Sequence, residues 1–344
     1  MNPRAAYTID ARLHWIDTDI LIASRGARLV QSSDAGATWR QLTTLPCGTS
    51  GVLSRSRIAR RLMRSGVYHV VPGLHNELVV MAFGQVFVVS TVDGQLLAAP
   101  TPIHGSRPLA LAKSAGNLYY GEYHGNSQRG PMRVFRSHDG GRNWEVVWTF
   151  AGIRHIHTVL ANEDEIWVTT GDLDEECGIW VTRDEFRTMD RIVGGEQRYR
   201  AVQLLFDQGS VFYGTDAPNS PNYICRLDRR SGVVERVQTV EGPVFYGCIA
   251  GDCMYFSTVC EPTDIGRNRE AGVWQRGLHD SNWVRVLSFQ KDIWPMRLCQ
   301  YGQVVFPAGS MSNALLWLSP MATEHDQNSL AFRFADLRRK SIDC

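Results

Sequence analysis

The chain has 344 residues, 44% of them hydrophobic and 21% charged, which is typical of a protein with a substantial core and a polar surface. Its 36 basic and 35 acidic residues give a formal net charge of +1, so composition offers no reason to expect nucleic acid or a membrane as a partner. No run approaches the roughly 18 consecutive apolar residues of a transmembrane helix. The opening MNPRAAYTIDARLHW lacks the apolar core of a secretory signal.

Cysteine usage indicates a reducing compartment. The eight cysteines are spread along the chain without a CxxC pair, which in a chain of this length is typical of buried thiols and not of a disulfide framework. Together with the missing signal segment, this pattern predicts a cytoplasmic protein. The cysteines are Cys47, Cys177, Cys225, Cys248, Cys253, Cys260, Cys299 and Cys344.

From one end to the other, short runs rich in Val, Ile, Tyr, Phe and Trp alternate with Gly, Asp and Asn, and helix signals are almost absent. The runs group in fours, and a unit of about 45 residues with four strands is typical of a β-propeller, whereas a pair of β-sandwiches would not repeat so evenly. We therefore predict an all-β fold, with residues 1–344 forming a single seven-bladed β-propeller of four antiparallel strands per blade. The predicted blades are approximately 11–45, 60–103, 107–150, 154–195, 199–240, 243–290 and 293–340.

Two octapeptides, SSDAGATW at 32–39 and SHDGGRNW at 137–144, share the pattern S-x-D-x-G-x-[T/N]-W between the third and fourth strands of a blade. The aspartates can accept backbone N–H bonds inside a tight turn, and the glycines permit a backbone shape that a Cβ would oppose. The tryptophans are expected to pack between blades. These six residues are Asp34, Gly36, Trp39, Asp139, Gly141 and Trp144.

The octapeptides resemble the Asp box (BNR repeat) of the sialidase-like β-propellers. The resemblance implies a structural turn on the face opposite the active site, so the repeat bears on the fold and not on catalysis. A degraded copy, TRDEFRTM, starts at Thr182 and lacks the Gly and the Trp.

Ligand sites of propellers form where the chain enters the innermost strands and leaves the second strands, because these loops meet over the central channel. Five of the ten histidines fall at such positions, with arginines and acidic residues beside them. Paired surface charges and satisfied core histidines are the ordinary alternative. The entries hold Tyr68, His69, His104, Arg107, Arg154, His155, His157, Arg198, Arg200, Trp294 and Arg297. The turns hold Glu122, Tyr123, His124, Asn126, Asp172, Asp174, Glu175, Glu176, Asp216, Asn219, Glu261 and Asp264.

Metal binding is one open possibility at this face. His155 and His157 alternate on a strand and so share one side of it, as a zinc site can require. Spacing fixes no third ligand, and the acidic turns are equally suited to Ca²⁺. The sequence therefore establishes no cofactor, while a structural or catalytic divalent metal stays possible.

The residue types at the mouth suit a polysaccharide lyase acting on a uronic-acid-containing glycan. β-Elimination needs a cation to neutralise the uronate carboxylate, which Arg provides, and a base and an acid, for which His and Tyr are suited. The chain also resembles propeller-fold lyases such as ulvan and rhamnose–glucuronate lyases, which implies His104 and His124 as base or acid, Tyr123 or Tyr213 as their partner, and Arg200 or Arg226 as the carboxylate clamp. Arg107, His155, His157, Asn126 and Trp294 complete the predicted substrate-binding set, and the predicted partner is an anionic glycan.

Two other functions remain open. The Asp-box resemblance suggests a sialidase-type glycoside hydrolase, with arginines from Arg107, Arg154, Arg200 and Arg297 and carboxylates from Glu122, Asp172 or Asp216. Against it, Arg57-Ile58 is followed by Ala where that family has Pro, and the family has six blades. A non-catalytic propeller that binds glycan or protein is the third possibility, and the concentration of tunable histidines argues against it.

Overall fold

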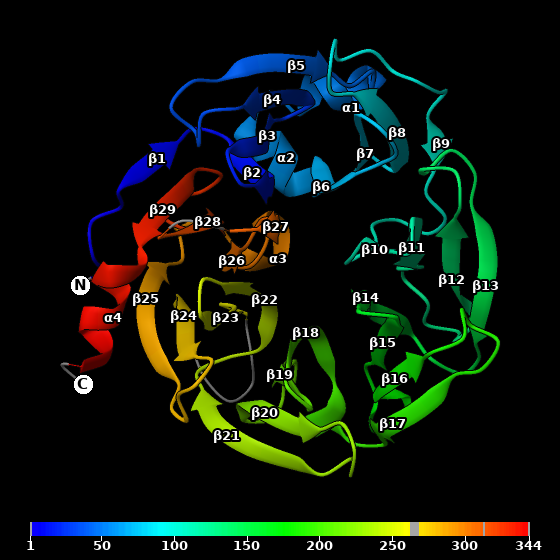
Figure 1. Ribbon diagram of the computed structural model, residues 1–344, viewed down its shortest axis with the longest axis vertical. Coiled ribbons are helices and arrows are strands. Elements are labelled where there is room, and N and C mark those ends of the chain that lie inside the picture. Colours follow the sequence, from blue (N-terminus) through cyan, green and yellow to red (C-terminus); the bar gives the residue numbers. More distant parts are fainter. Residues whose placement is uncertain (1, 262–267, 312–313, 343–344) are drawn as a thin grey trace.

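Seven sheets are arranged in a ring in the computed structural model, which describes residues 2–261, 268–311 and 314–342 (Figure 1). Six of the sheets have four strands, and the sheet of β2 to β5 (residues 12–44) gains a fifth, β27 (Ala308–Ser310). Within blades 1 to 6 the four blade strands are antiparallel neighbours in chain order, and blade 7 takes its outermost strand from the N-terminal segment, so the predicted seven-bladed β-propeller is confirmed. Each sheet is covered on both faces by adjacent blades. The second strands of the blades therefore read as continuous apolar runs such as ELVVMA at 77–82, whereas outermost strands such as β5 (Arg40–Thr44) and β13 (Glu145–Phe150) are largely exposed.

The strands of the first four blades have the following bounds. Blade 1 holds β2 (Arg12–Asp17), β3 (Ile20–Arg25), β4 (Arg28–Ser32) and β5 (Arg40–Thr44). Blade 2 holds β6 (Val67–Pro72), β7 (Glu77–Ala82), β8 (Gln85–Ser90) and β9 (Thr101–Pro102). Blade 3 holds β10 (Ala112–Ser114), β11 (Asn117–Gly121), β12 (Met132–Ser137) and β13 (Glu145–Phe150). Blade 4 holds β14 (His155–Asn162), β15 (Glu165–Gly171), β16 (Gly178–Thr182) and β17 (Asp190–Gly194).

The remaining blades complete the ring. Blade 5 holds β18 (Ala201–Asp207), β19 (Ser210–Thr215), β20 (Asn222–Asp228) and β21 (Val234–Val240). Blade 6 holds β22 (Val244–Ala250), β23 (Cys253–Thr258), β24 (Glu270–Gly277) and β25 (Val284–Gln290). Blade 7 holds β26 (Gln303–Val305), β28 (Leu315–Met321), β29 (Ser329–Arg333) and β1 (Tyr7–Ile9), while β27 (Ala308–Ser310) runs parallel to β2.

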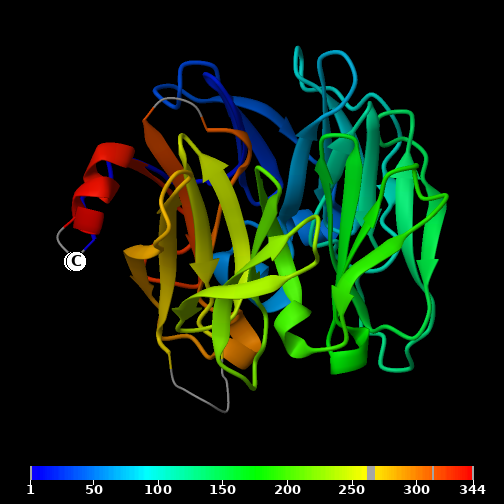
Figure 2. The same ribbon diagram turned by 60° about the horizontal axis from the view of Figure 1, so that its bottom comes forward.

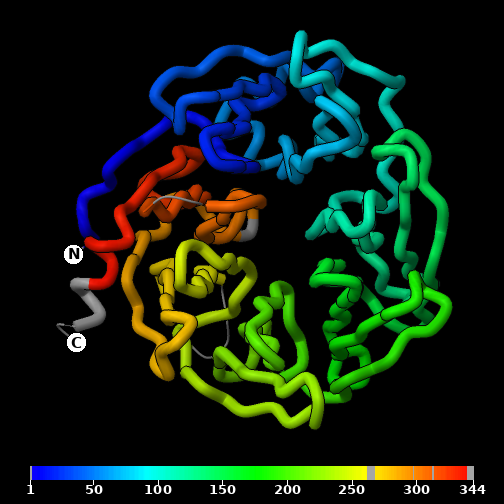
Figure 3. Tube along the Cα trace, in the orientation of Figure 1, coloured from blue at the N-terminus to red at the C-terminus, as the bar shows by residue number. Residues whose placement is uncertain are grey.

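The ring is closed by the N-terminal segment. β1 is the outermost strand of blade 7 and pairs with β29, with Tyr7 opposite Ala331 and Ile9 opposite Ser329. The sequence had placed all four strands of this blade within 293–340. The last described segment is instead a helix, α4 (Phe334–Ile342), which packs on β25 and β29 beside the N-terminal segment (Figure 3).

Short helices sit in the connections between blades. α1 (Gly48–Leu53) and α2 (Arg57–Met63) link blades 1 and 2, so the second blade starts with β6 and not near residue 60. α3 (Met296–Cys299) precedes β26, and the 3₁₀ turns η1 (Asp174–Glu176) and η2 (Gln197–Tyr199) lie in blades 4 and 5. Within the described ranges, no helix combines the length and apolar character needed to cross a bilayer.

The connections gather at the two ends of the blades (Figure 2). The chain enters the innermost strands and leaves the second strands at one end, which we call the mouth. The turns between third and fourth strands lie at the other end, which we call the far face. All seven cysteines in the described part of the chain are free thiols.

The two octapeptides form the same hydrogen-bonded turn on the far face. Asp34 accepts bonds from the backbone N–H and the hydroxyl of Thr38, at 2.9 and 2.6 Å. Asp139 accepts the matching pair from Asn143, at 2.9 and 2.7 Å. A Cβ at Gly141, where φ is +90°, would lie 2.9 Å from a methyl group of Val79 in blade 2. The turn therefore needs glycine both for its backbone angle and for contact with the neighbouring blade.

A third copy of this turn occupies 182–188, although its sequence lacks the glycine and the tryptophan. Asp184 accepts bonds from the backbone N–H and the hydroxyl of Thr188, at 2.9 and 2.7 Å. Phe186 stands where the others have glycine, at φ +70°, and its buried ring packs 5.7 Å from that of Tyr119 in blade 3. Burial of this ring offsets the backbone strain that the glycines avoid.

We expect Asp139→Ala to lower the free energy of unfolding by about 1–3 kcal/mol, because the turn's N–H donors lose their acceptor. Urea denaturation measures the change. Asp164→Ala, at an exposed turn position, is the matched control and should stay within about 0.5 kcal/mol of wild type. Equal effects of the two changes would show that the octapeptide turn adds nothing to stability.

Candidate functional site

Blades 4 and 5 bring charged side chains together at the mouth. β14 begins at His155, which pairs with Gly171 at the end of β15, so His155 and Asp172 lie at the same end of the blade. β18 begins after Arg200 and pairs at Ala201 with Thr215, which places Arg200 beside Asp216 in the next blade.

Asp172 is the centre of this cluster. Its carboxylate lies 3.2 Å from Nδ1 of His155 and 3.4 Å from Nε2 of His157. Two guanidinium groups contact the same carboxylate, that of Arg154 at 3.2 Å and that of Arg200 at 3.0 Å. Both histidines are buried, and Nδ1 of His157 has no hydrogen-bond partner within the described residues. His155 thus has one ring nitrogen held by a carboxylate, as in the His–Asp pairs that orient a general base.

Arg200 joins two carboxylates. Besides Asp172, it contacts Asp216 through Nε at 3.0 Å. Burial alone would raise the pKa of Asp172, but hydrogen bonds from His155 and His157 and the charge of Arg200 outweigh it and hold that pKa far below its usual range. Asp216 is more deeply enclosed, and burial raises its pKa despite the opposing charge of Arg200. Burial would lower the pKa of Arg200, but the carboxylates of Asp216 and Asp172 raise it.

An aromatic and cationic rim borders the cluster on the side of blade 3. The Tyr123 ring stacks against His155 with centroids 4.5 Å apart, and burial raises the pKa of its phenol, so Tyr123 is a proton donor at neutral pH. The Arg107 guanidinium acts electrostatically on Tyr123 and Tyr68 and has no acidic partner among residues 2–261, 268–311 and 314–342. A cation without an acidic partner at the mouth favours an anionic ligand.

Blades 6 and 7 contribute a second pair of residues to the mouth, next to blade 5. Burial, followed by the charge of Asp216, raises the pKa of Glu261 to about 7, while a hydrogen bond with Tyr301 opposes this rise. Arg64, at the end of α2, lies over the Tyr301 ring at 5.9 Å from its centroid. Glu261 therefore holds a proton that it can donate near neutral pH.

The predicted metal possibility can be tested against this geometry. His155, His157 and Asp172 offer three ligand atoms within 4.8 Å of one another, which suits zinc or a non-haem iron. However, Arg154 and Arg200 already contact the carboxylate, and a dication would lie beside two fixed cations. The donor types fit a metal and the charges do not, so no step below runs through one.

Several predicted residues meet at this cluster. His155, His157, Arg200 and Asp172 are in direct contact, Tyr123 stacks on them, and Arg107 borders them. The two histidines proposed as catalysts are arranged differently. His104 is exposed and stacks on Phe135 at 4.6 Å, and His124 pairs with Glu122 at 3.6 Å.

The other predicted residues have structural partners elsewhere. Tyr213 is fully buried between blades 4 and 5, where its hydroxyl donates to the Arg198 carbonyl at 2.9 Å. Arg226 contacts Ser210, at the far-face end of β19. The buried amide of Asn126 donates to the Gly130 and Ile153 carbonyls and fixes its loop. Trp294 lies near α2, where it lines a pocket together with Ile58 and Arg61. Asp264 and the Arg297 side chain fall outside the described residues.

Sequence reasoning missed two members of the site and gave a third no role. Tyr301 and Arg64 were not singled out, and Glu261 was noted only as one acidic turn residue among many. These residues come from the start of blade 7, the helix before blade 2 and the end of β23. Only the closed ring brings them together, so spacing along the chain contains no signal for the pair.

No known protein family matches the chain, and no curated protein matches its sequence. Solved structures share its fold. A chain of the mitotic checkpoint complex has a TM-score of 0.61 at 11% identity, with 97% of this chain and 95% of that chain covered. The WD40 propeller domain of Doa1 gives 0.60 at 11% identity, covering 96% and 97%. YCF48 bound to a D1 peptide gives 0.58 at 11% identity, covering 97% and 98%. At these identities the likeness extends to the β-propeller fold alone.

Proposed function

We propose that the mouth is the active site of a lyase that cleaves a uronic-acid-containing glycan by β-elimination. The observation that supports it best is the His155–Asp172 pair beside Arg107, a cation without an acidic partner in the described chain. A base with its orienting carboxylate and a free guanidinium are the two groups that abstraction of a proton next to a carboxylate requires.

Each group has a defined role in the proposed reaction. Arg107 binds the uronate carboxylate and makes the neighbouring C5 proton more acidic. Nε2 of His155 takes that proton, the electron pair of the broken C5–H bond forms the C4=C5 double bond, and the C4–O4 bond breaks. Glu261 gives its proton to the departing O4. The products are a 4,5-unsaturated uronate and a free hydroxyl group.

This assignment moves the base from His104 and His124 to His155. The reason is that the Asp172 carboxylate, 3.2 Å away, orients the buried His155 ring. His104 only stacks on Phe135, and His124 lies on the rim beside Glu122. A catalytic base needs an orienting partner to keep one ring nitrogen free for the substrate.

A glycoside hydrolase is the second candidate, and one observation favours it. Tyr301 and Glu261 are joined by a hydrogen bond beside Arg64, and the Asp-box resemblance implies a Tyr–Glu nucleophile pair. In that reaction the ionised form of Glu261 takes the phenolic proton of Tyr301, whose oxygen attacks the anomeric carbon. The glycosidic C–O bond breaks, and the departing oxygen takes a proton from water. Seven blades in place of six separate this chain from that family.

Ultraviolet absorbance and reducing-end assays on a panel of uronate-containing glycans and their oligomers separate these functions. Elimination creates a conjugated double bond that absorbs, and hydrolysis creates reducing ends without absorbance. We expect rising absorbance that His155→Gln abolishes and His104→Gln retains. Reducing ends without absorbance would establish the hydrolase. Silence in both assays, with glycan binding intact, would indicate a binding propeller.

The raised pKa of Glu261 predicts where activity falls on the alkaline limb of the pH profile. Because the acid must be protonated, we expect kcat/KM to fall as pH rises through about 7, the pKa of Glu261. Glu261→Gln should lower kcat and remove this limb. A raised pKa also means that the folded protein loses stability between the ordinary value of 4.5 and about 7, so the variant should gain stability relative to wild type over that interval. An unchanged alkaline limb in Glu261→Gln would remove Glu261 from the reaction.

A further inference from the structure

The amphipathic helix α2 turns its charged side toward the protein and its apolar side outward. Its arginines recur at 57, 60, 61 and 64, which is one helical face, and this face is turned toward the propeller. Arg61 is the only buried residue in the helix, while Ile58, Leu62 and Met63 are each about half exposed. Water-soluble surfaces normally show the opposite arrangement, so the outward apolar face needs an explanation.

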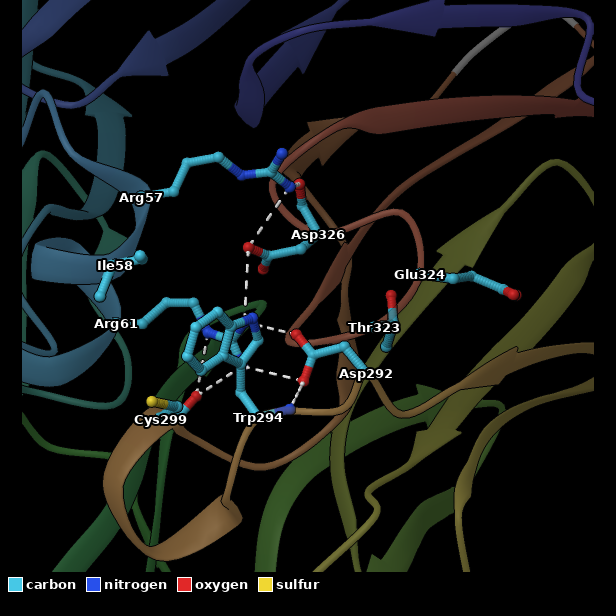
Figure 4. Close-up of a pocket in the computed structure, with 9 residues that line it drawn as sticks. All are labelled: Arg57, Ile58, Arg61, Asp292, Trp294, Cys299, Thr323, Glu324 and Asp326. Carbon is cyan, nitrogen blue, oxygen red and sulfur yellow. Dashed lines mark hydrogen bonds and ion pairs between the residues drawn. The ribbon is translucent and has the colours of Figure 1, made fainter.

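Polar contacts hold the inward face in place. Arg61 pairs with Asp292 and donates to the Cys299 carbonyl at 3.0 and 2.8 Å. Arg57 pairs with Asp326 at 3.4 Å (Figure 4). These arginines are fixed by partners from blade 7 and the loop before it. If the helix turned its apolar side inward, the buried carboxylate of Asp326 would lose its arginine partners, while Asp292 would keep Lys291.

Neighbouring segments extend the apolar face. α1 has no buried residue and leaves Val52 and Leu53 exposed, and Leu298 of α3, beside α2, is 63% exposed. The loop before α3 presents Ile293, 91% exposed, and Trp294. We call this set the apolar shelf; its members are Val52, Leu53, Ile58, Leu62, Met63, Ile293, Trp294 and Leu298. It borders the mouth, because Arg64 at the end of α2 lies over Tyr301.

The charges around the apolar shelf are mainly positive. Arg55 is exposed and has no ion-pair partner among the described residues, and the Arg57 side chain is 58% exposed. Arg64 is also exposed. Of the two acidic residues in the loop between β28 and β29, Glu324 is the exposed one. Asp292 and Asp326 are covered by their arginine partners. A second copy of the chain would place like charges against one another, so the rim favours an anionic occupant.

We propose that the apolar shelf docks the propeller onto an anionic lipid surface, with the mouth facing the membrane. Protruding apolar side chains with a tryptophan and a ring of arginines match the chemistry of the interface, where apolar groups enter the acyl boundary and cations meet lipid phosphates. The nearly neutral whole-chain charge conceals this local excess. The proposal stands independently of the lyase assignment, since it concerns binding alone.

Vesicle co-sedimentation tests the proposal with the full chain. We expect binding to vesicles of equal parts phosphatidylcholine and phosphatidylglycerol, weaker binding to phosphatidylcholine alone, and a decrease with added salt. Leu62→Asp/Ile293→Asp should reduce binding about tenfold or more. Ile293→Asp alone, at a loop position where folding is not at risk, should reduce it in the same direction. Val92→Asp is the matched control, because Val92 is 70% exposed on a far-face turn, and it should bind as wild type does.

Three outcomes would overturn the proposal. The first is wild type wholly in the supernatant with both vesicle types, and the second is sedimentation of both apolar-shelf variants as wild type. The third is a dimer, seen by light scattering, that Leu62→Asp/Ile293→Asp dissociates, which would assign the apolar shelf to a second copy. Thermal unfolding of each variant confirms that any loss of binding occurs in a folded protein.

Discussion

Asp172→Asn is expected to reduce kcat by about 10³–10⁴-fold while the propeller stays folded. In wild type the carboxylate accepts from Nδ1 of His155, so the other ring nitrogen is left without a proton and can act as a base. An Asn amide can donate its N–H to Nδ1 and so stabilise the wrong tautomer. The histidine then has no free lone pair facing the substrate.

Kinetics and folding must be measured together for this variant. Arg154 and Arg200 lose the charge of Asp172, so some loss of stability is expected, and circular dichroism and thermal unfolding monitor it. The matched control is Asp174→Asn, an exposed carboxylate on η1 two residues away, which should retain wild-type kcat. Full activity of a folded Asp172→Asn protein would rule out His155 as the base.

The fold was predictable because blade-forming strands leave a strong local signal. Apolar runs bounded by turn residues recur through the chain, and the octapeptides mark two of the turns on the far face. These local patterns do not show which strands pair across long distances in the sequence. Closure of blade 7 by β1 depends on Tyr7 meeting Ala331, and no local pattern encodes that contact. α2 also escaped prediction, because its arginines face the protein and its apolar residues face outward.

The site was predictable in position and less so in composition. Propeller geometry places strand entries and second-strand exits at one mouth, which is why His155, His157 and Arg200 all contact Asp172. Side-chain direction was harder to infer. All of β19 is buried, so alternation cannot show that Tyr213 points into the core between blades. The Glu261–Tyr301 pair joins blades 6 and 7 and needs the closed ring.

Arg200→Met is expected to give the largest loss of stability, about 3–5 kcal/mol at pH 7. Arg200 is the ion-pair partner of Asp216 in the described chain and shares Asp172 with Arg154. Its removal leaves the Asp216 carboxylate enclosed without a cation. Urea denaturation at pH 7 measures the change in free energy of unfolding.

Two features distinguish this loss from ordinary packing damage. The deficit should shrink as pH is lowered toward 5, because burial already raises the pKa of Asp216 and the uncompensated carboxyl can take up a proton in the folded state. Arg200→Met/Asp216→Asn should recover part of the loss, since the pair acts as a unit. Arg226→Met, whose 3.8 Å pair with Glu235 is exposed, should cost less than about 1 kcal/mol. A pH-independent deficit without recovery in the double variant would mean that Arg200 stabilises the blades through its contacts and not through its charge.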